Sequence, residues 1–241
     1  MTAKKRAPKH EASDSVRGEW LRRVEAEYRS AAITQHLGLW LLQIGASPDL
    51  VKLAMRIASD EVAHADLSFR CYGAAGGESL PHIPRETLEL SRTSDPLELD
   101  VLRVVVDVFC IGETIAVPLF KNLREHCTVP VAKRVLDRVL RDEVRHRDFG
   151  WTALTWLLEE HPLQEQLRAV VAAELPLFFR RIRGTYAPPG VAEIDAISPK
   201  DRAWGLMAPA RYGAVVTRTL ERDWVPRFKK LGFDARAAWG G

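Results

Sequence analysis

The pattern Asp-Glu-x-x-His occurs twice in this chain, at residues 60–64 and 142–146. Each copy lies within a long stretch whose apolar residues recur at helical spacing. On a helix, a glutamate and a histidine three positions apart lie on one face and can bind the same metal ion. The repeated pattern therefore favours folds in which two long helices present the same pair of donors.

The residues that share a face with each Glu/His pair are mainly apolar. The face of Glu61 and His64 carries Leu50, Leu53, Ala54, Ile57, Ala65 and Ser68. The face of Glu143 and His146 carries Leu136, Val139, Leu140, Gly150 and Leu154. A single Glu-x-x-His is a common surface pattern, but a buried carboxylate is costly unless it is paired or bound to a cation. Two such pairs in one core predict a dinuclear metal centre that supplies the positive charge.

The rest of the chain also has helical character. No stretch alternates between apolar and polar residues as a β-strand does. Long helices are expected over about 14–44, 48–72, 96–126 and 130–160, a short one over 85–92, and two more over 162–183 and 209–231. The β-branched stretch 101–109 is assigned to a helix because its apolar pattern continues for about 30 residues. Pro118 is expected to interrupt that helix. The predicted fold class is all-α.

Three segments follow from this pattern. Residues 1–13 are expected to be a flexible basic tail, 14–160 a four-helix bundle, and 161–241 C-terminal helices packed on the bundle in the same domain. About 23 residues separate the second and third long helices, and half of them, extended at about 3.3 Å each, could recross the bundle. One long crossover is therefore expected at this point.

The remaining two long helices should each add one carboxylate to the centre. Glu113 lies on an apolar stripe that carries no basic residue. On the first helix, Glu27 lies on the apolar stripe, whereas Glu25 lies beside Arg22 and Arg29 as expected for a solvated ion pair. We choose Glu27 and Glu113.

The positions of these donors along the helices agree with one another. Glu27 precedes the turn at Gly45 by about 27 Å, and His64 follows the same turn by about 26 Å, at about 1.5 Å per residue. Glu113 precedes the turn at residues 127–129 by about 21 Å, and Glu143 follows the same turn by about 21 Å. All six donors are thus expected within about one helical turn of one level.

The complete set comprises Glu27, Glu61-x-x-His64, Glu113 and Glu143-x-x-His146. It resembles the ferritin-like di-iron carboxylate superfamily over residues 14–160. The aspartate before each glutamate is similar to the oxygen-activating members, such as the bacterial multicomponent monooxygenases, more than to the iron-storage ferritins. The resemblance implies a ferritin-like four-helix bundle with these six metal ligands. It also implies that Asp60 and Asp142 each hydrogen-bond a ligand histidine and fix its tautomer.

Two departures from relatives narrow the expected chemistry. The para-aminobenzoate N-oxygenases carry an extra histidine where this chain has Val139, so an N-oxygenase with that ligand set is not expected. The second to fourth long helices hold no tyrosine near the expected metals except Tyr72, three turns from Glu61, so a stable tyrosyl radical is not indicated. Glu174 is a candidate seventh ligand, although a salt bridge with a nearby arginine is the preferred interpretation.

Four carboxylates and two imidazoles suit two iron ions, with manganese or a mixed manganese–iron pair as alternatives. The preferred function is an O2-dependent di-iron oxidase or oxygenase acting on a small organic substrate, with an external electron donor and a homodimer as further expectations. The alternatives are a ferroxidase or other iron-handling protein, a manganese catalase-like peroxide scavenger, and a helical interaction protein with structural carboxylates.

Composition excludes several other classes. The 35 Lys and Arg against 32 Asp and Glu give a net charge of +3, too weak to indicate nucleic-acid binding. No apolar stretch approaches the length of a membrane helix, and no apolar segment follows the basic start as in a secretory signal. Three cysteines at irregular spacing indicate reduced thiols. A cytoplasmic protein is expected.

Overall fold

The computed structural model describes residues 12–190 and 196–240. Over these ranges all regular secondary structure is helical, which confirms the predicted fold class. The predicted flexible tail lies outside the described residues except for Ala12 and Ser13, and Ser13 is the N-cap of the first helix. Among the described helices, none has the length and apolar character needed to cross a bilayer.

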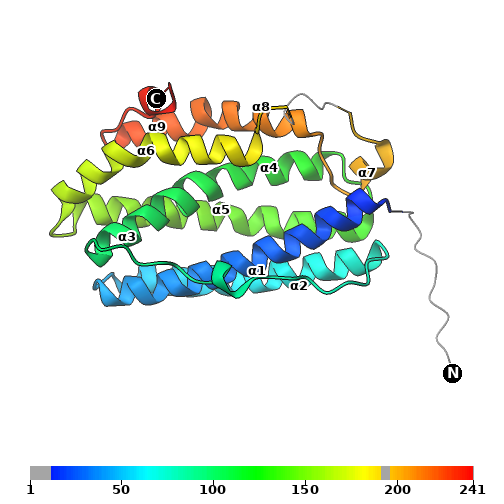
Figure 1. Ribbon diagram of the computed structural model, residues 1–241, viewed down its shortest axis with the longest axis horizontal. Coiled ribbons are helices and arrows are strands. Elements are labelled where there is room, and N and C mark those ends of the chain that lie inside the picture. Colours follow the sequence, from blue (N-terminus) through cyan, green and yellow to red (C-terminus); the bar gives the residue numbers. More distant parts are fainter. Residues whose placement is uncertain (1–11, 191–195, 241) are drawn as a thin grey trace.

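The first two helices form an antiparallel pair (Figure 1). Helix α1 spans Asp14–Gln43 and α2 spans Pro48–Ala74. The Oγ atoms of Ser13 and Ser47 accept hydrogen bonds from backbone N–H groups in the first turns of α1 and α2. Gly45 lies between the helices with a φ of 74°, which a residue with a side chain rarely adopts. The sequence signals at residues 44–48 therefore produce the expected tight turn.

The segment between α2 and the third long helical stretch, which begins at Leu97, runs along the length of the bundle (Figure 1). It confirms the predicted long crossover, and the backbone N–H of Leu90 ties it to α1 by donating to His36 Nδ1 at 2.9 Å. The predicted helix over 85–92 is wrong, because only a single 3-10 turn, Arg85–Thr87, forms there. Thr87 Oγ1 donates to the carbonyl of Pro84 at 2.7 Å, a local side-chain hydrogen bond of the kind that competes with continued helix.

The third rod contains a stretch of π-helix. It comprises α3 (Leu97–Val104), the π-helix η2 (Val105–Glu113) and α4 (Thr114–Glu125). The predicted interruption at Pro118 is wrong, since α4 continues through that residue and the irregularity comes before it. Helix α5 (Pro130–Glu159) then returns antiparallel to α4 and completes the bundle.

The π-helix packs closely against α5 at a glycine. A Cβ atom placed on Gly150 would lie 2.5 Å from the Cβ of Phe109 and 2.8 Å from its carbonyl carbon. Real side chains do not approach this closely, so only glycine allows the two backbones to reach their observed separation. Gly150 is one turn beyond His146, and Phe109 is one turn before Glu113, so this contact lies next to the predicted site.

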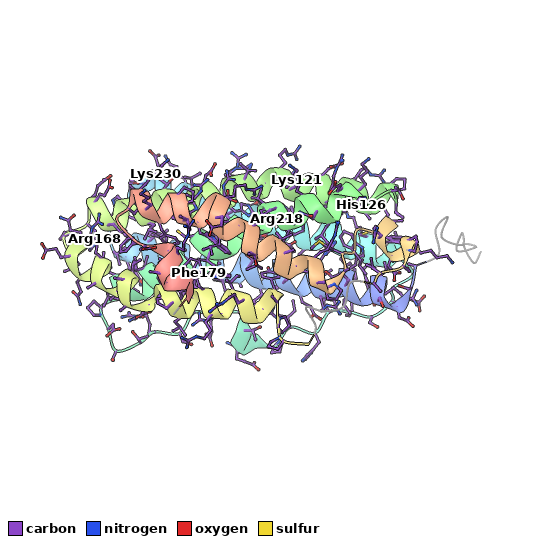
Figure 2. All side chains as sticks on the ribbon, turned by 90° about the horizontal axis from the view of Figure 1, so that it is seen from above. Lys121, His126, Arg168, Phe179, Arg218 and Lys230 are labelled. Carbon is purple, nitrogen blue, oxygen red and sulfur yellow. The ribbon has the colours of Figure 1, made fainter. Side chains whose placement is uncertain are left out.

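The remaining helices cover one side of the bundle. They are α6 (Gln164–Tyr186), α7 (Pro199–Ala203), α8 (Pro209–Thr219), the π-helix η3 (Leu220–Trp224), α9 (Val225–Lys230) and α10 (Ala235–Gly240). Seen from above, α6 and the α8–α9 segment lie side by side along the bundle (Figure 2). Phe179 of α6 is buried among Trp224, Phe228 and Trp239, with ring centroids 5.4–6.1 Å apart. An aromatic cluster thus joins α6, α9 and α10.

Candidate metal centre

The six predicted donors converge inside the bundle. Two groups of four residues each have ligand atoms within 4.8 Å of one another. One group is Glu27, Glu61, His64 and Glu143, and the other is Glu61, Glu113, Glu143 and His146. Because Glu61 and Glu143 belong to both groups, the two groups adjoin and share two carboxylates, and each group could hold one cation.

Each rod of the bundle contributes to the cluster. Glu27 comes from α1, the first Glu/His pair from α2, Glu113 from the last residue of η2, and the second pair from α5. Glu27 and Glu113 are each 8% exposed, whereas the other four residues are 2% exposed or less. The two outer carboxylates are thus the most accessible of the six donors.

Both imidazoles direct Nδ1 toward the carboxylates. His64 Nδ1 lies 3.3 Å from Glu61 Oε2 and 3.6 Å from Glu27 Oε2. His146 Nδ1 lies 3.3 Å from Glu61 Oε1 and 3.7 Å from Glu143 Oε2. The two nitrogens therefore face the same cluster of oxygens from α2 and α5.

The other ring nitrogens face the two aspartates in a crossed arrangement. His64 Nε2 lies 3.2 Å from Oδ2 of Asp142, which belongs to the second motif. His146 Nε2 lies 3.7 Å from Oδ2 of Asp60, which belongs to the first. Each aspartate thus supports the histidine of the other helix, a feature that the spacing within one motif does not reveal.

Two arginines on α5, which the sequence analysis did not select, hold these aspartates. Arg145 lies 3.1 Å from Asp60 and 3.4 Å from Asp142, while Arg138 lies 3.4 Å from Asp60 and also pairs with Asp142. Burial raises the pKa of Asp142, but the hydrogen bonds from Arg138 and His64 outweigh this effect and hold the pKa below its usual value. The signal in the sequence is the spacing of Arg138, Asp142 and Arg145, which places them on one helix face.

Burial and mutual charge also shift the pKa values of the donors. Burial raises the pKa of Glu27 to about 8, and burial together with the neighbouring Glu143 raises that of Glu113 well above its usual range. Burial opposes charge on the imidazoles, but the facing carboxylates raise the pKa of His64 to about 11 and of His146 to about 12. Positive charge is therefore strongly favoured within the cluster, whether protons or metal cations supply it.

The donor set fits a pair of metal ions. Glu143 Oε2 and both ring nitrogens of His146 are buried without a hydrogen-bond partner in the described part of the chain. Such orphaned polar atoms are costly unless a ligand satisfies them. Carboxylate oxygens and imidazole nitrogens without thiolate suit iron or manganese, and four carboxylates balance two divalent charges.

Nearby acidic residues outside the cluster have other partners. The carboxylate of Glu25 accepts a hydrogen bond from the backbone N–H of His82 at 3.4 Å and is absent from both groups of donors. Glu174 accepts hydrogen bonds from Arg103 at 2.8–3.0 Å, as the salt-bridge interpretation predicted. Ser30 Oγ, which the sequence analysis did not select, donates to Glu61 Oε1 at 2.9 Å.

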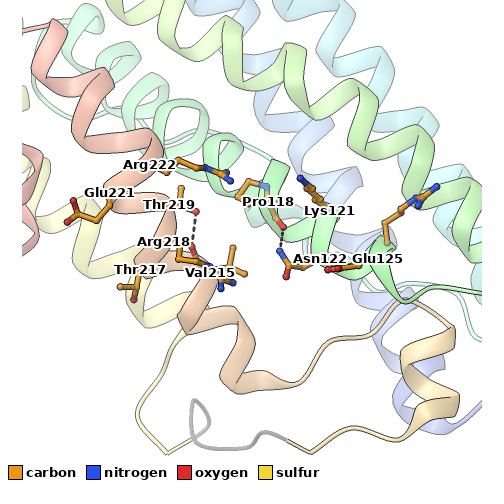
Figure 3. A pocket seen from close by; sticks show the side chains of 11 residues that line it. Pro118, Lys121, Asn122, Glu125, Val215, Thr217, Arg218, Thr219, Glu221 and Arg222 are labelled. Atoms are coloured by element: carbon orange, nitrogen blue, oxygen red, sulfur yellow. Dashed lines mark hydrogen bonds between the residues drawn. The ribbon is translucent and has the colours of Figure 1, made fainter.

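Two pockets of similar size lie outside the donor cluster. One, of about 850 Å³, lies between α4 and the α8–η3 segment, with Lys121 and Arg218 on its walls (Figure 3). None of the six donors lines it. The other, of about 860 Å³, lies between α1 and residues 185–188 and 196–212, and Tyr186 is on its wall.

Tyr186 lies outside the second to fourth long helices, the only ones on which the sequence was searched for a tyrosine near the expected metals. Burial raises the pKa of the Tyr186 phenol, and the carboxylates of Glu113, Glu143 and Glu27 add to the effect. Tyr186 is the last residue of α6, and its ring stacks on that of Tyr212.

Comparison with solved structures supports the ferritin-like fold. The chain is similar to a protein with aldehyde deformylating oxidase activity from Synechococcus, with a TM-score of 0.51 and 18% sequence identity over 90% of this chain and 94% of that chain. No family model and no curated protein match the chain. The all-α bundle with its long crossover is therefore a ferritin-like fold, and its interior holds a carboxylate and histidine cluster that can bind metal.

Proposed function

We propose that this chain is an O2-dependent non-haem di-iron oxidase or oxygenase that acts on a small organic substrate. The observation that carries the proposal is the pair of donor groups that share Glu61 and Glu143. Two cations in such groups lie close enough to act on one small molecule together. The oxidase activity of the structurally similar Synechococcus protein agrees with this function.

The residues of this chain would hold the metals in a fixed geometry. His64 and His146 present Nδ1 to the cluster. Asp142, hydrogen-bonded to His64 Nε2, keeps that ring in the tautomer that leaves Nδ1 free to coordinate, and Asp60 faces Nε2 of His146 at 3.7 Å. Arg138 and Arg145 form ion pairs with both aspartates and hold them in place.

The shared and outer carboxylates differ in their surroundings. The hydrogen bond from Ser30 Oγ restrains Glu61, whereas Glu27 and Glu113, each 8% exposed, are the most accessible of the six donors. When bound, two iron ions supply the redox chemistry for the reduction of O2, and an external electron donor is a proposed partner.

A reconstitution experiment tests this proposal. Metal-free protein is loaded anaerobically with two equivalents of ferrous iron and then exposed to O2, while bound metal is counted by mass spectrometry. We expect two ions per chain, consumption of O2 and a change in near-ultraviolet and visible absorbance. A wild-type protein that binds two ions without any O2-dependent change would refute the oxidase proposal.

The control uses two neighbouring glutamates of α1, Glu25 and Glu27. Glu27→Gln removes a predicted ligand and should abolish the O2-dependent change, while Glu25→Gln, two residues away and outside the donor groups, should retain it. Equal behaviour of the two variants would contradict the ligand assignment. Oxygen evolution from peroxide by manganese-loaded protein, or assembly into a large closed oligomer, would favour the catalase-like or iron-storage alternatives.

A further inference from the structure

Exposed hydrophobic side chains gather on the outer side of the α1–α2 hairpin. Helices α6, α8 and α9 lie on the other side of the bundle from this hairpin (Figure 1). Of the nine large hydrophobic residues that are exposed in the described part of the chain, five are on the hairpin and are 47–60% exposed. They are Tyr28, Leu39 and Leu42 of α1 and Met55 and Val62 of α2. An exposed apolar patch with several large side chains is typical of an interaction surface.

These side chains line two adjoining pockets between α1 and α2. The pocket of about 410 Å³ has Tyr28 and Val62 on its walls, and the pocket of about 140 Å³ has Leu39 and Leu42. Gln35 and Met55 line both pockets. The two pockets therefore form one groove along the hairpin, with Gln35 and Met55 at its centre.

The outward-facing residues have the spacing of helices that pack on other helices. On α1 the intervals alternate between four and three residues, at Tyr28, Ala32, Gln35, Leu39 and Leu42. On α2 the interval is seven residues, at Met55, Val62 and Phe69. We call these eight residues the hairpin face. Its two seams lie side by side and suit a helical partner.

The α1 part of the hairpin face has no charged residue. Residues 30–47 contain no Asp, Glu, Lys or Arg, although one side of this part of α1 is at the surface. A helix with one side in water normally keeps that side polar and charged, whereas the core of a protein–protein interface is depleted of charge. Two copies of this chain can bring these stretches together without placing like charges in contact.

The α1 seam is complementary to itself when a second copy runs antiparallel. A two-fold axis at Gln35 places Tyr28 of one copy opposite Leu42 of the other, since each is seven residues from Gln35. It also brings the small Ala32 within one residue of the level of Leu39, so a small side chain meets a large one. The two Gln35 amides meet at the axis, where each can donate to the carbonyl oxygen of the other. A polar pair at such a position fixes the register of packed helices.

The size of the hairpin face agrees with a dimer. From Leu42 to the level of Phe69 it is about 30 Å long, and two helices of about 10 Å diameter make it about 20 Å wide. Each copy contributes about 600 Å², or about 1,200 Å² in total, which reaches the range of specific protein–protein interfaces. A single helix of another protein, about 10 Å wide, would cover only about half of this width.

We propose that the chain forms a homodimer in which the hairpin faces of two copies pack antiparallel across a two-fold axis at Gln35. This inference does not rest on the proposed function. The donors Glu27 and Glu61 are buried inside the bundle, whereas the hairpin face is on the outside of the same two helices. Loss of metal binding therefore leaves the dimer intact, and loss of the dimer leaves the donor cluster complete within each chain.

Sedimentation velocity of the full chain tests the dimer. At micromolar concentrations we expect a species of twice the chain mass of 27.1 kDa. Leu39→Glu should weaken dimerisation about 100-fold or more, because each dimer would bury two carboxylates in an apolar contact. Leu177→Glu is the matched control, since Leu177 is 45% exposed on α6, and this variant should remain dimeric. Circular dichroism should show the wild-type helix content in both variants, because both side chains are exposed.

Disulfide cross-linking tests the antiparallel orientation. Gln35→Cys should form a covalent dimer on mild oxidation, because the two copies of this residue meet at the axis and disulfide-bonded Cα atoms are about 4.4–6.8 Å apart. Leu39→Cys should not, since its two copies lie about 12 Å apart along the helices. The native thiols of Cys71, Cys110 and Cys127 are buried and should not interfere.

Several results would overturn the inference. They are a wild-type chain that stays monomeric at micromolar concentrations, a dimer that Leu39→Glu leaves intact, and equal cross-linking of the two cysteine variants, as a parallel dimer would give. A monomer that binds phosphatidylcholine vesicles, and loses this binding in Leu39→Glu, would assign the hairpin face to a lipid surface and also exclude the dimer.

Discussion

Substitution of Gly150 by alanine tests how closely the π-helix must approach α5. The new Cβ would lie 2.5 Å from Phe109 Cβ and 2.8 Å from the carbonyl carbon of Phe109, whereas favourable carbon contacts lie at about 3.5–4.0 Å. The two helices must separate by about 1 Å, and because backbone is involved we take the upper end of the usual overpacking cost, about 3 kcal/mol. Alanine returns about 1 kcal/mol through its better helix propensity, so a net loss of about 2 kcal/mol is expected.

The assay is thermal unfolding of metal-free protein together with a count of bound metal. A loss of about 2 kcal/mol should lower Tm by about 4–8 °C in a chain of this length. Gly18→Ala is the control, because its Cβ would meet only the end of Arg22 at 3.5 Å, and it should raise Tm by about 2–4 °C. In Gly150→Ala, the separation of the two helices should also move Glu113 away from His146 and reduce the bound metal below two ions per chain. A Gly150→Ala protein that melts as high as Gly18→Ala and binds both ions would refute this reasoning.

Three further predictions concern single side chains. Glu113→Ala should reduce bound iron from two ions to one, as counted by mass spectrometry, because only one donor group loses a ligand; retention of both ions would contradict the assignment. Asp142→Asn should weaken metal affinity about 10- to 100-fold in competition with a chelator, since His64 loses its charged support; unchanged affinity would argue against that role. Asp100→Asn should cost about 1.5–3 kcal/mol in urea unfolding at pH 7. Although burial raises the pKa of Asp100, hydrogen bonds from Thr93 and Arg92 lower it overall, so the ionised carboxylate stabilises the folded chain at pH values above the unfolded pKa. This stabilisation should disappear as the pH falls through the lower pKa of the folded state. A stability difference between the wild type and Asp100→Asn that persists at acid pH would exclude the ionised carboxylate as its cause.

The donor residues were predictable because their signals are local. Helical spacing placed each Glu/His pair on one face, and counting residues from the tight turns placed Glu27 and Glu113 at the same level. The structure brings these six residues together, and it discriminates between Glu25 and Glu27 as the apolar stripe did. The crossover was predictable from chain length alone.

Other features depend on contacts between distant segments. The π-helix η2 could not be predicted from its own sequence, because the contacts around it come from residues far along the chain. Gly150 of α5 packs closely against it, and Trp224 Nε1 donates a hydrogen bond to the carbonyl of Cys110 at 3.2 Å. Tyr186 shares a pocket with residues of α1 only because α6 packs on the bundle, so periodicity within one helix does not identify it. The pairing of Asp60 with His146 likewise requires that α2 and α5 be placed side by side.

The crossed aspartate–histidine pairs make the candidate centre dependent on both halves of the bundle. The α1–α2 hairpin alone lacks the partner of His64, and the second half alone lacks the partner of His146. Neither half can pre-form a finished coordination sphere during synthesis, although α1 and α2 are complete long before α5 leaves the ribosome. If the cluster holds metal ions as proposed, their capture is a late step in maturation that waits until the two hairpins have docked.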